Sequence, residues 1–244
     1  MSMKKTLVII PAYNEEGNIG KLLESLLKIT DISFDIVVIN DCSKDNTSSI
    51  CKSYGVHVID LPCNLGIGGA VQTGYKFALK NGYDIAIQVD GDGQHPPEYI
   101  RHIIQPILNG EADLVIGSRY LLEEGFKSTF VRRLGIQFFS KLIKLLTKQT
   151  VSDPTSGFRA CNKKVIKLFA SSYPKDYPEP ETIVILKRNN LAVSEIPVVM
   201  KEREKGVSSI NLTRSVYYMF KVSLAIIIDT FREPIRNLSE GENI

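Results

Sequence analysis

The chain has 244 residues, 43% of them hydrophobic and 23% charged, with a formal net charge of +3. These values are typical of a globular protein with a full core, and they show no global nucleic-acid signature, so we expect no nucleic-acid partner. The four cysteines are widely spaced without a Cys-x-x-Cys pair, which suggests neither zinc nor a disulfide framework. We therefore expect reduced thiols and a cytoplasmic protein without a signal peptide.

Strands and helices alternate through the first half of the chain. An apolar run over 6–11 ends at a proline, which predicts a strand buried on both faces, and a helical pattern follows with Asn14 as its expected cap. Further strands are expected over 34–39, 56–61, 86–90 and 112–117, and further helices over 45–54, 66–79 and 97–108. This alternation predicts an α/β fold whose mostly parallel sheet is covered by helices on both faces.

Helical patterns dominate after about residue 120, and the segments 153–157 and 177–181 are expected to be loops. A last long strand is expected over 192–204, at a sheet edge because it contains Pro197. No linker separates two globular units. We expect one catalytic domain over 1–210, and a C-terminal amphipathic helix with a polar tail over 211–244.

Polar residues recur where the expected strands end. In open α/β sheets, ligands bind outside the carboxyl ends of the strands. Glu15, Asp41 and Asp90 follow three such strands and together outline a nucleotide-sized site. The simple alternative is that these residues cap helices, as Asn and Asp do in any such fold, and for Asn14 and Asp45 that alternative stays open.

The stretch from Asp90 to Asp92 carries two carboxylates one residue apart. Residues i and i+2 of an extended chain point the same way, so both carboxylates can converge on one cation. Mg²⁺ and Mn²⁺ prefer such oxygen ligands and bridge readily to phosphates. An isolated Asp-x-Asp also occurs as a polar turn after a strand.

Six motifs in chain order resemble the inverting family 2 glycosyltransferases of GT-A fold, and most of all the dolichyl- or polyprenyl-phosphate hexose synthases. They lie at 8–16, 38–45, 64–70, 89–96, 117–120 and 153–159. Each motif is weak alone, but all six in this order are specific. The resemblance covers about residues 4–210 and implies a GT-A fold.

The resemblance implies roles for individual residues. The catalytic set would be Asp92, Arg119, Asp153 and Arg203. The donor-binding set would be Pro11, Ala12, Tyr13, Glu15, Asp41, Gly66, Asp90, Gly91, Arg132 and Ser208. Glu15 would accept hydrogen bonds from ribose hydroxyls and Asp41 would bind the base. Mg²⁺ or Mn²⁺ would be held on the donor diphosphate by Asp90, Asp92 and Gln94.

The implied reaction is a metal-dependent, inverting transfer of a hexose from a UDP- or GDP-sugar to a polyprenyl phosphate, in cell-envelope glycan or glycoprotein biosynthesis. A lipid phosphate is already anionic and needs no catalytic base. Asp153 would position the acceptor, or serve as a base for a hydroxyl acceptor, with Glu179 and Glu181 as other base candidates; it could equally be a turn residue before proline. Ile136 stands near a position where the family has a serine at the lipid-phosphate site.

Two other functions stay open at this point. One is transfer to a sugar hydroxyl of a growing polysaccharide, which would require a carboxylate base. The other is an inactive nucleotide-sugar-binding subunit of a membrane complex. The complete set of metal and phosphate ligands argues against the inactive subunit.

Two apolar segments suit a membrane surface. Residues 129–148 form a basic amphipathic pattern with its polar residues in one stripe, Arg133, Gln137, Lys141, Lys144 and Lys148. The apolar run over 216–228 is too short to cross a bilayer. We expect a protein peripheral to the cytoplasmic face of the membrane. A solvated basic face, a small membrane-protein partner and a homodimer are the alternatives.

Overall fold

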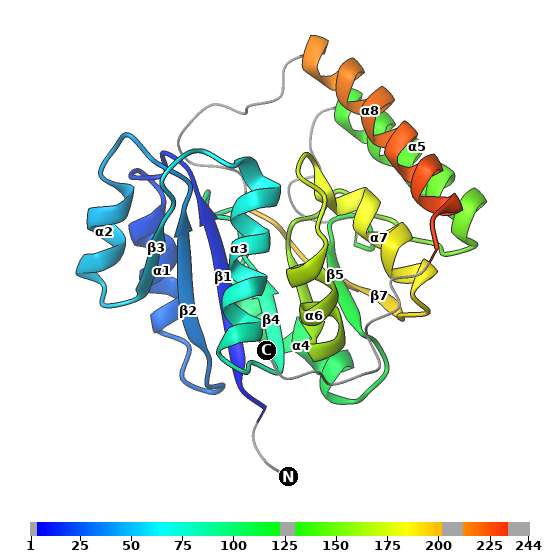
Figure 1. Cartoon of the computed structure of the whole chain (residues 1–244). Coiled ribbons are helices and arrows are strands. Elements are labelled where there is room, and N and C mark those ends of the chain that lie inside the picture. Colours follow the sequence, from blue (N-terminus) through cyan, green and yellow to red (C-terminus); the bar gives the residue numbers. More distant parts are fainter. Residues whose placement is uncertain (1–3, 123–129, 202–211, 234–244) are drawn as a thin grey trace.

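The structure is a computed structural model that describes residues 4–122, 130–201 and 212–233. At its centre lies a seven-stranded sheet with the order β3-β2-β1-β4-β6-β5-β7 (Figure 1). The strands are β1 (Thr6–Ala12), β2 (Asp35–Asn40), β3 (His57–Asp60), β4 (Ile85–Gln88), β5 (Leu114–Ser118), β6 (Arg159–Asn162) and β7 (Val193–Pro197). The helices are α1 (Ile19–Leu27), α2 (Thr47–Ser53), α3 (Gly66–Lys80), α4 (Ile100–Leu108) after a 3-10 turn over Pro97–Tyr99, α5 (Phe130–Thr147), α6 (Lys163–Ser171), α7 (Pro178–Arg188) and α8 (Leu212–Phe231).

The mostly parallel sheet expected from the sequence is confirmed. The exception is β6, which runs antiparallel between β4 and β5. Strand β6 was not predicted, because its four residues are too few to show a period and begin with the charged Arg159. The final strand is also shorter than expected: β7 ends at Pro197, although its expected place at the sheet edge is correct.

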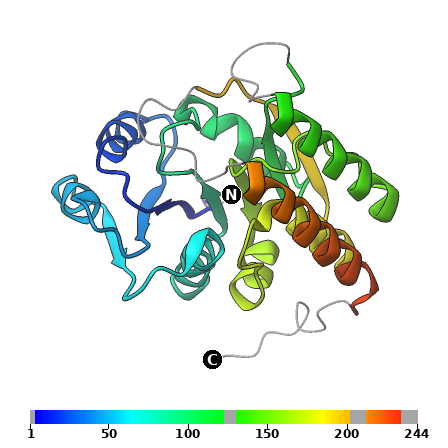
Figure 2. The same ribbon diagram turned by 90° about the horizontal axis from the view of Figure 1, so that it is seen from above.

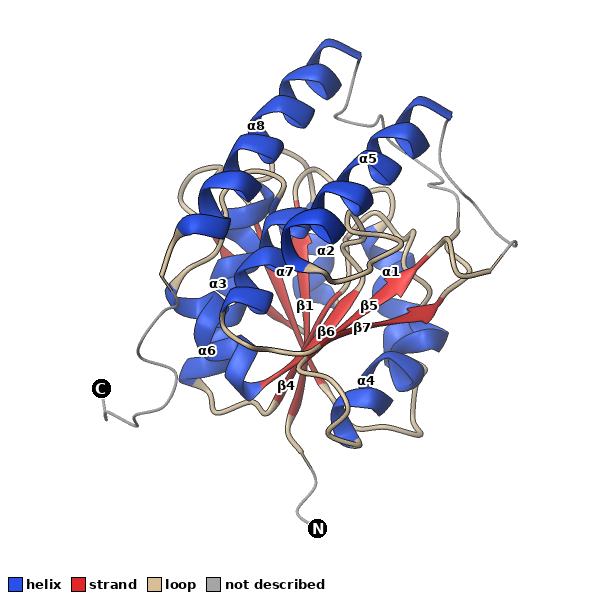
Figure 3. Ribbon diagram, turned by 90° about the vertical axis from the view of Figure 1, so that its right-hand side faces the viewer, coloured by secondary structure: helices blue, strands red, loops and turns tan. Residues whose placement is uncertain are grey.

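Strand β1 is buried on both faces, as its continuous apolar run predicts. Leu7 and Ile9 pack in the core that also contains residues of α3 and α6. Val8 and Ile10 pack in the opposite core with residues of α1 and α4. Helices therefore cover both sheet faces (Figure 3), and in such a sheet ligands bind outside the carboxyl ends of the parallel strands.

Two local expectations were wrong. Asn14 does not cap α1, which begins at Ile19. It has a left-handed backbone (φ 55°), and its side-chain oxygen accepts the N–H of Lys44 at 2.8 Å, so it joins the loops after β1 and β2. The segment 177–181 is not a loop throughout, because α7 begins at Pro178. Prolines are tolerated in a first helical turn, whose N–H groups have no helical partner.

Helices α5 and α8 lie side by side at one end of the molecule and both contact α7 (Figures 1 and 2). The five polar residues of the predicted α5 stripe are all exposed, as expected. Across the part of the chain that the structure describes, every helix is too short or too polar to span a membrane.

Candidate functional site

The loops that follow β1, β2 and β4 meet at one edge of the sheet. Asp41 donates its N–H to the carbonyl of Ala12 at 2.9 Å, and Gly91 donates to the carbonyl of Pro11 at 3.3 Å. A Cβ at Gly91 would lie 3.1 Å from that Pro11 oxygen, a tight contact that favours a small residue there. The fold thus brings together predicted site residues that are far apart in the sequence.

The carboxylate of Asp41 is buried and anchors the entry to α3. Its two oxygens accept the N–H groups of Leu65 at 2.7 Å and of Gly66 at 2.9 Å. Gly66 has φ 76°, a left-handed conformation that favours glycine. Tyr13, two residues before Glu15, is exposed. The carboxylate of Glu15 accepts a hydrogen bond from the side chain of Asn18 at 2.8 Å. These residues line the strand ends where the sequence predicts the nucleoside pocket.

The first aspartate of the pair, Asp90, is held from three directions. Gln88 donates from Nε2 to Asp90 Oδ1 at 3.1 Å. The backbone N–H of Asp90 donates to Nδ1 of His95 at 2.9 Å, and Nε2 of the same ring lies 3.5 Å from Asp90 Oδ2. A Cβ on Gly157 would lie only 2.6 Å from Asp90 Oδ2, so any other residue here would have to displace that carboxylate.

His95 contacts Asp90, and no role was assigned to it from the sequence. It is buried and its ring packs against Phe158, with 5.4 Å between ring centroids. Because Nδ1 accepts a hydrogen bond, the proton of the neutral ring is on Nε2, which faces the Asp90 carboxylate. Its place in the motif after Gln94 was the only available signal.

The residues expected to hold a metal supply hard oxygen donors. Asp92 Oδ1 accepts the N–H of Gln94 at 3.1 Å, which folds the two residues into one tight turn. The side-chain amide nitrogen of Gln94 donates to the Lys201 carbonyl at 3.5 Å, so the amide oxygen is not used in this contact. Among the described residues no cluster of three His, Cys, Asp or Glu residues forms, and the predicted set needs only two carboxylates and one amide. This donor set fits Mg²⁺ or Mn²⁺.

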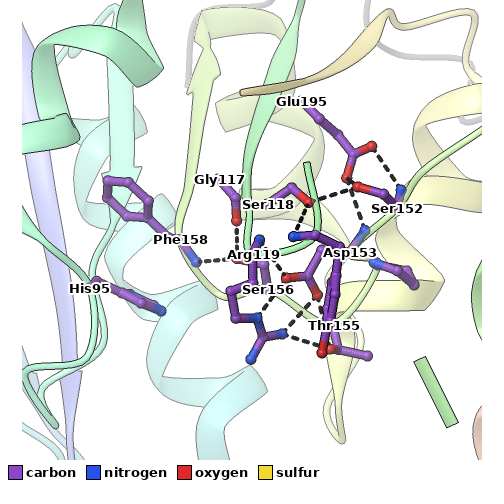
Figure 4. A network of polar contacts seen from close by, with 12 residues as sticks. His95, Gly117, Ser118, Arg119, Ser152, Asp153, Thr155, Ser156, Phe158 and Glu195 are labelled. Carbon is purple, nitrogen blue, oxygen red and sulfur yellow. Dashed lines mark hydrogen bonds and ion pairs between the residues drawn. The ribbon is translucent and has the colours of Figure 1, made fainter. Parts of the chain in front are cut away.

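Arg119 and Asp153 form a buried bidentate pair (Figure 4). Nε and Nη2 of Arg119 donate to the two Asp153 oxygens at 2.6 and 2.7 Å, and Nη2 also donates to Thr155 Oγ1 at 3.1 Å. Burial by itself lowers the pKa of Arg119, but the Asp153 hydrogen bond and the charges of Asp153 and Asp90 outweigh it and raise the pKa. Arg119 therefore stays a cation beside the Asp90 site.

The pairing limits what Asp153 can do. Its carboxylate is fully buried and both oxygens accept hydrogen bonds from Arg119. A general base must reach the proton that it removes. This geometry favours a positioning role for Asp153 over the base role. Asp153 is also more than a turn residue before proline, because its side chain binds Arg119.

Other predicted residues lie away from this centre or outside the described residues. Arg203 and Ser208 fall outside them, and of Arg132 only the backbone, in α5, is described. Ile136 is buried on the inner side of α5. Burial, followed by the hydrogen bond and charge of Asp229, raises the pKa of Glu181 to about 7. Glu181 therefore belongs to the contact between α7 and α8.

The sequence profile of glycosyl transferase family 2 matches residues 7–169. The chain is 34% identical over 219 residues to a UDP-N-acetylglucosamine–dolichyl-phosphate N-acetylglucosaminyltransferase of Methanococcus voltae, a match that covers 81% of this chain and 86% of the relative. It is 30% identical over 230 residues to a polyprenol monophosphomannose synthase of Mycolicibacterium smegmatis, with 90% and 86% covered.

A solved structure shares the fold. Glucosyl-3-phosphoglycerate synthase from Mycobacterium tuberculosis, crystallised with Mn²⁺, UDP-glucose and phosphoglyceric acid, superimposes with a TM-score of 0.70. The match covers 96% of this chain and 81% of that chain at 20% sequence identity. At this identity the likeness concerns the fold alone, and it agrees with the GT-A architecture predicted from the sequence.

Proposed function

Because the chain belongs to glycosyl transferase family 2, and is thus a glycosyltransferase, we propose that it transfers a hexose with inversion from a UDP- or GDP-sugar to a polyprenyl phosphate. The polyprenyl chain would be an undecaprenyl or dolichyl chain, and the product would serve cell-envelope glycan or glycoprotein biosynthesis. The observation that carries this proposal is the buried Arg119–Asp153 pair beside Asp90. It supports the proposal because Arg119 is a fixed cation near Asp90, and because the first candidate base, Asp153, is bound to that cation.

The proposed chemistry needs no catalytic base. An anionic oxygen of the lipid phosphate attacks the anomeric carbon, the bond from that carbon to the donor diphosphate breaks, and the nucleoside diphosphate leaves with the electron pair. Within the described residues, the protein hydrogen bonds of the Arg119 side chain use Nε and Nη2, so Nη1 is available for a phosphate oxygen. The guanidinium is always charged, so even this single N–H donor can form a charge-assisted hydrogen bond to phosphate.

The donor side of the proposal rests on the strand ends. Pro11, Tyr13 and Asp41 would line the nucleoside pocket, and Glu15 would meet the ribose hydroxyls. Asp90, Asp92 and Gln94 would hold Mg²⁺ or Mn²⁺. Such an ion, when bound, stabilises the negative charge of the departing diphosphate. The Mn²⁺ and UDP-glucose in the glucosyl-3-phosphoglycerate synthase complex are consistent with this assignment.

The relatives' names support a lipid phosphate as acceptor. Both named transferases act, by their names, on dolichyl phosphate or make a polyprenol monophosphate sugar. A hydroxyl acceptor would require a carboxylate base, and Asp153, the first candidate, is closed to solvent and paired. We therefore favour the lipid phosphate over the growing polysaccharide.

The exposed face of α8 supports a membrane location. Its exposed side chains from Phe220 to Phe231 are almost all apolar: Phe220, Leu224, Ile227, Ile228 and Phe231, with Phe220 73% and Phe231 84% exposed. Beside it, α5 exposes Leu134, Phe138 and Leu145. Monomeric soluble proteins rarely expose contiguous apolar surface of this kind.

The basic stripe of α5 borders this apolar surface. Lys141 and Lys144 are exposed on α5, and exposed Lys148 directly follows the last residue of this helix, Thr147. An apolar face flanked by lysines suits an anionic membrane surface, whereas two copies joined through this face would bring their basic stripes together. We propose that α8, in the segment 211–244, and α5 rest on the cytoplasmic face of the membrane. A homodimer or a small membrane-protein partner would be the contrary results.

A donor screen tests the proposed function. The full chain is incubated with Mn²⁺, a short-chain polyprenyl phosphate and a panel of UDP- and GDP-sugars, and lipids are analysed by mass spectrometry. We expect one donor to give a lipid whose mass increases by one sugar residue. Absence of a glycolipid with every donor, in the presence of folded protein that binds nucleotide, would overturn the lipid-phosphate acceptor.

A further inference from the structure

We infer that Glu195 and Arg159 are positioning residues that hold the segment 152–157 from its two sides, and that this segment sets the separation between Arg119 and Asp90. The catalytic meaning of this inference rests on the proposed function, whereas its structural part does not. Arg159 ends the motif over 153–159 but was given no role from the sequence, and Glu195 belongs to none of the six motifs.

Glu195 holds the beginning of the segment. Its Oε2 accepts the N–H of Ser152 at 2.7 Å, and its Oε1 accepts the N–H of Asp153 at 2.9 Å and the hydroxyl of Ser152 at 3.0 Å (Figure 4). Hydrogen bonds to an ionised carboxylate are stronger than those between neutral groups. No described residue forms an ion pair with Glu195, so these three donors are the protein groups that bind its carboxylate.

Arg159 holds the other side of the segment. Its Nε donates to the Ser156 carbonyl at 2.7 Å and its Nη2 to the Pro154 carbonyl at 2.9 Å, while Nη1 donates to Thr182 in α7 at 2.7 Å. The guanidinium is almost fully buried, and among described residues it has no carboxylate partner within ion-pair distance. An unpaired buried cation is costly, so its hydrogen bonds to these carbonyls are essential for its burial.

Glu195 and Arg159 bind opposite kinds of backbone group in the segment 152–157. A carboxylate binds N–H groups at the start of the segment, and a guanidinium binds carbonyl groups further along it. Strand register fixes both positions, because Glu195 in β7 lies opposite Ile116 in β5, and Arg159 in β6 pairs with the same Ile116. The segment is therefore held from both strands that flank β5, β7 on one side and β6 on the other.

The held segment touches both halves of the site. Near its start, Asp153 binds Arg119 through two hydrogen bonds. At its end, Gly157 lies against the Asp90 carboxylate, where a Cβ would come within 2.6 Å. A shift of this segment would move the phosphate-directed arginine relative to the proposed metal ligand. In-line transfer depends on that relation, since a misplacement of about 1 Å can cost about 10²-fold in rate.

Glu195→Gln tests the inference with little change of shape. One carboxylate oxygen becomes an NH₂ group, which faces an N–H donor and cannot accept from it. We expect hydrogen exchange of the Ser152 and Asp153 amides to become faster by at least tenfold. We also expect kcat for sugar transfer to fall by about 10- to 100-fold with the KM of the donor unchanged. Glu195→Asp, which keeps both acceptors, should restore part of kcat.

The matched control is Glu111→Gln, the same chemical change at an exposed carboxylate before β5 that accepts a hydrogen bond only from Asn109 among described residues. It should change neither the hydrogen exchange of the amides at 152–153 nor kcat.

Arg159→Lys provides a second test, which is measured by hydrogen exchange of the amides at 156–158. If this variant does not fold, the Glu195→Gln result alone decides the inference. Unchanged exchange in Glu195→Gln, or a fall in activity matched by a rise in donor KM, would overturn the inference. If the wild type transfers no sugar to lipid phosphate but exchange responds as expected, the proposed function fails and the positioning role stands.

Discussion

Arg119 and Asp153 face each other across 34 residues of sequence, and both oxygens of the buried carboxylate bind the guanidinium, at 2.6 and 2.7 Å. The backbone N–H of Arg119 also donates to Asp153 Oδ2 at 3.2 Å. The pair therefore fixes the main chain after β5 as well as the side chain. It explains how a cation can be kept almost fully buried beside the proposed phosphate site.

Removing one partner of this pair should destabilise the protein strongly. Asp153→Asn leaves the Arg119 charge buried without a carboxylate, and breaking such a pair costs about 3–5 kcal/mol. Urea denaturation of the variant measures this loss. The double variant Arg119→Met/Asp153→Asn, which removes the buried charge, should regain much of the stability and remain inactive. A single variant as stable as the wild type would show that the pair contributes little.

The glycine beside Asp90 should be required for metal binding. In Gly157→Ala the new Cβ must push against Asp90 Oδ2, at 2.6 Å in the present geometry. We expect Mn²⁺ affinity in the presence of UDP or GDP, measured by calorimetry, to fall at least tenfold while circular dichroism stays unchanged. Gly135→Ala in α5 is the control, because its nearest atom outside the helix backbone would be Met219 Sδ at 3.9 Å. Equal affinities for the two variants would contradict the account.

His95 should be needed for local stability around the site. His95→Phe keeps the ring packing against Phe158 but removes the acceptor of the Asp90 N–H. An unsatisfied buried donor costs about 1–3 kcal/mol, so we expect a lower Tm and weaker Mn²⁺ binding. The control His102→Phe, at an exposed position in α4, should leave both unchanged. A His95 variant that binds Mn²⁺ as the wild type does would exclude this role.

Stability should depend on the protonation of Glu181. Burial and the neighbouring Asp229 raise the pKa of Glu181 from 4.5 to about 7, so the folded state binds the proton more tightly than the unfolded state does. The contribution is fully present below about pH 4.5 and is lost as the pH rises through 7. We expect the difference in Tm between the wild type and Glu181→Gln to widen between pH 5 and 8, with the wild type losing stability. Parallel pH profiles would argue against the raised pKa.

The apolar face of α8 should determine membrane binding. The double variant Phe220→Asp/Phe231→Asp places charges where two highly exposed phenylalanines stand, and we expect cosedimentation with anionic liposomes to fall at least tenfold. Leu108→Asp, at an exposed leucine at the end of α4, should leave liposome binding unchanged. If the double variant still cosediments and the wild type is a dimer in gel filtration, the face is a contact between copies.

The sequence predicted what depends on local pattern and missed what depends on strand order. The buried strand β1 and the polar residues after β1, β2 and β4 show in continuous apolar runs and the turns that end them. Arg119 and Asp153 were expected as separate functional residues, but their pairing follows from the antiparallel insertion of β6, which four residues cannot reveal. For the same reason Glu195 looked like an ordinary charged residue of an edge strand. Its hydrogen bonds join groups more than 40 residues apart.

The most direct test of the central claim compares two acceptors that differ only in phosphate. The full chain is incubated with Mn²⁺, the donor identified by the screen, and either a short-chain polyprenyl phosphate or the corresponding polyprenol. The products are analysed by mass spectrometry. The account predicts a glycosylated lipid from the phosphate alone, and none from folded Asp92→Ala protein. Equal or preferential glycosylation of the polyprenol would contradict it.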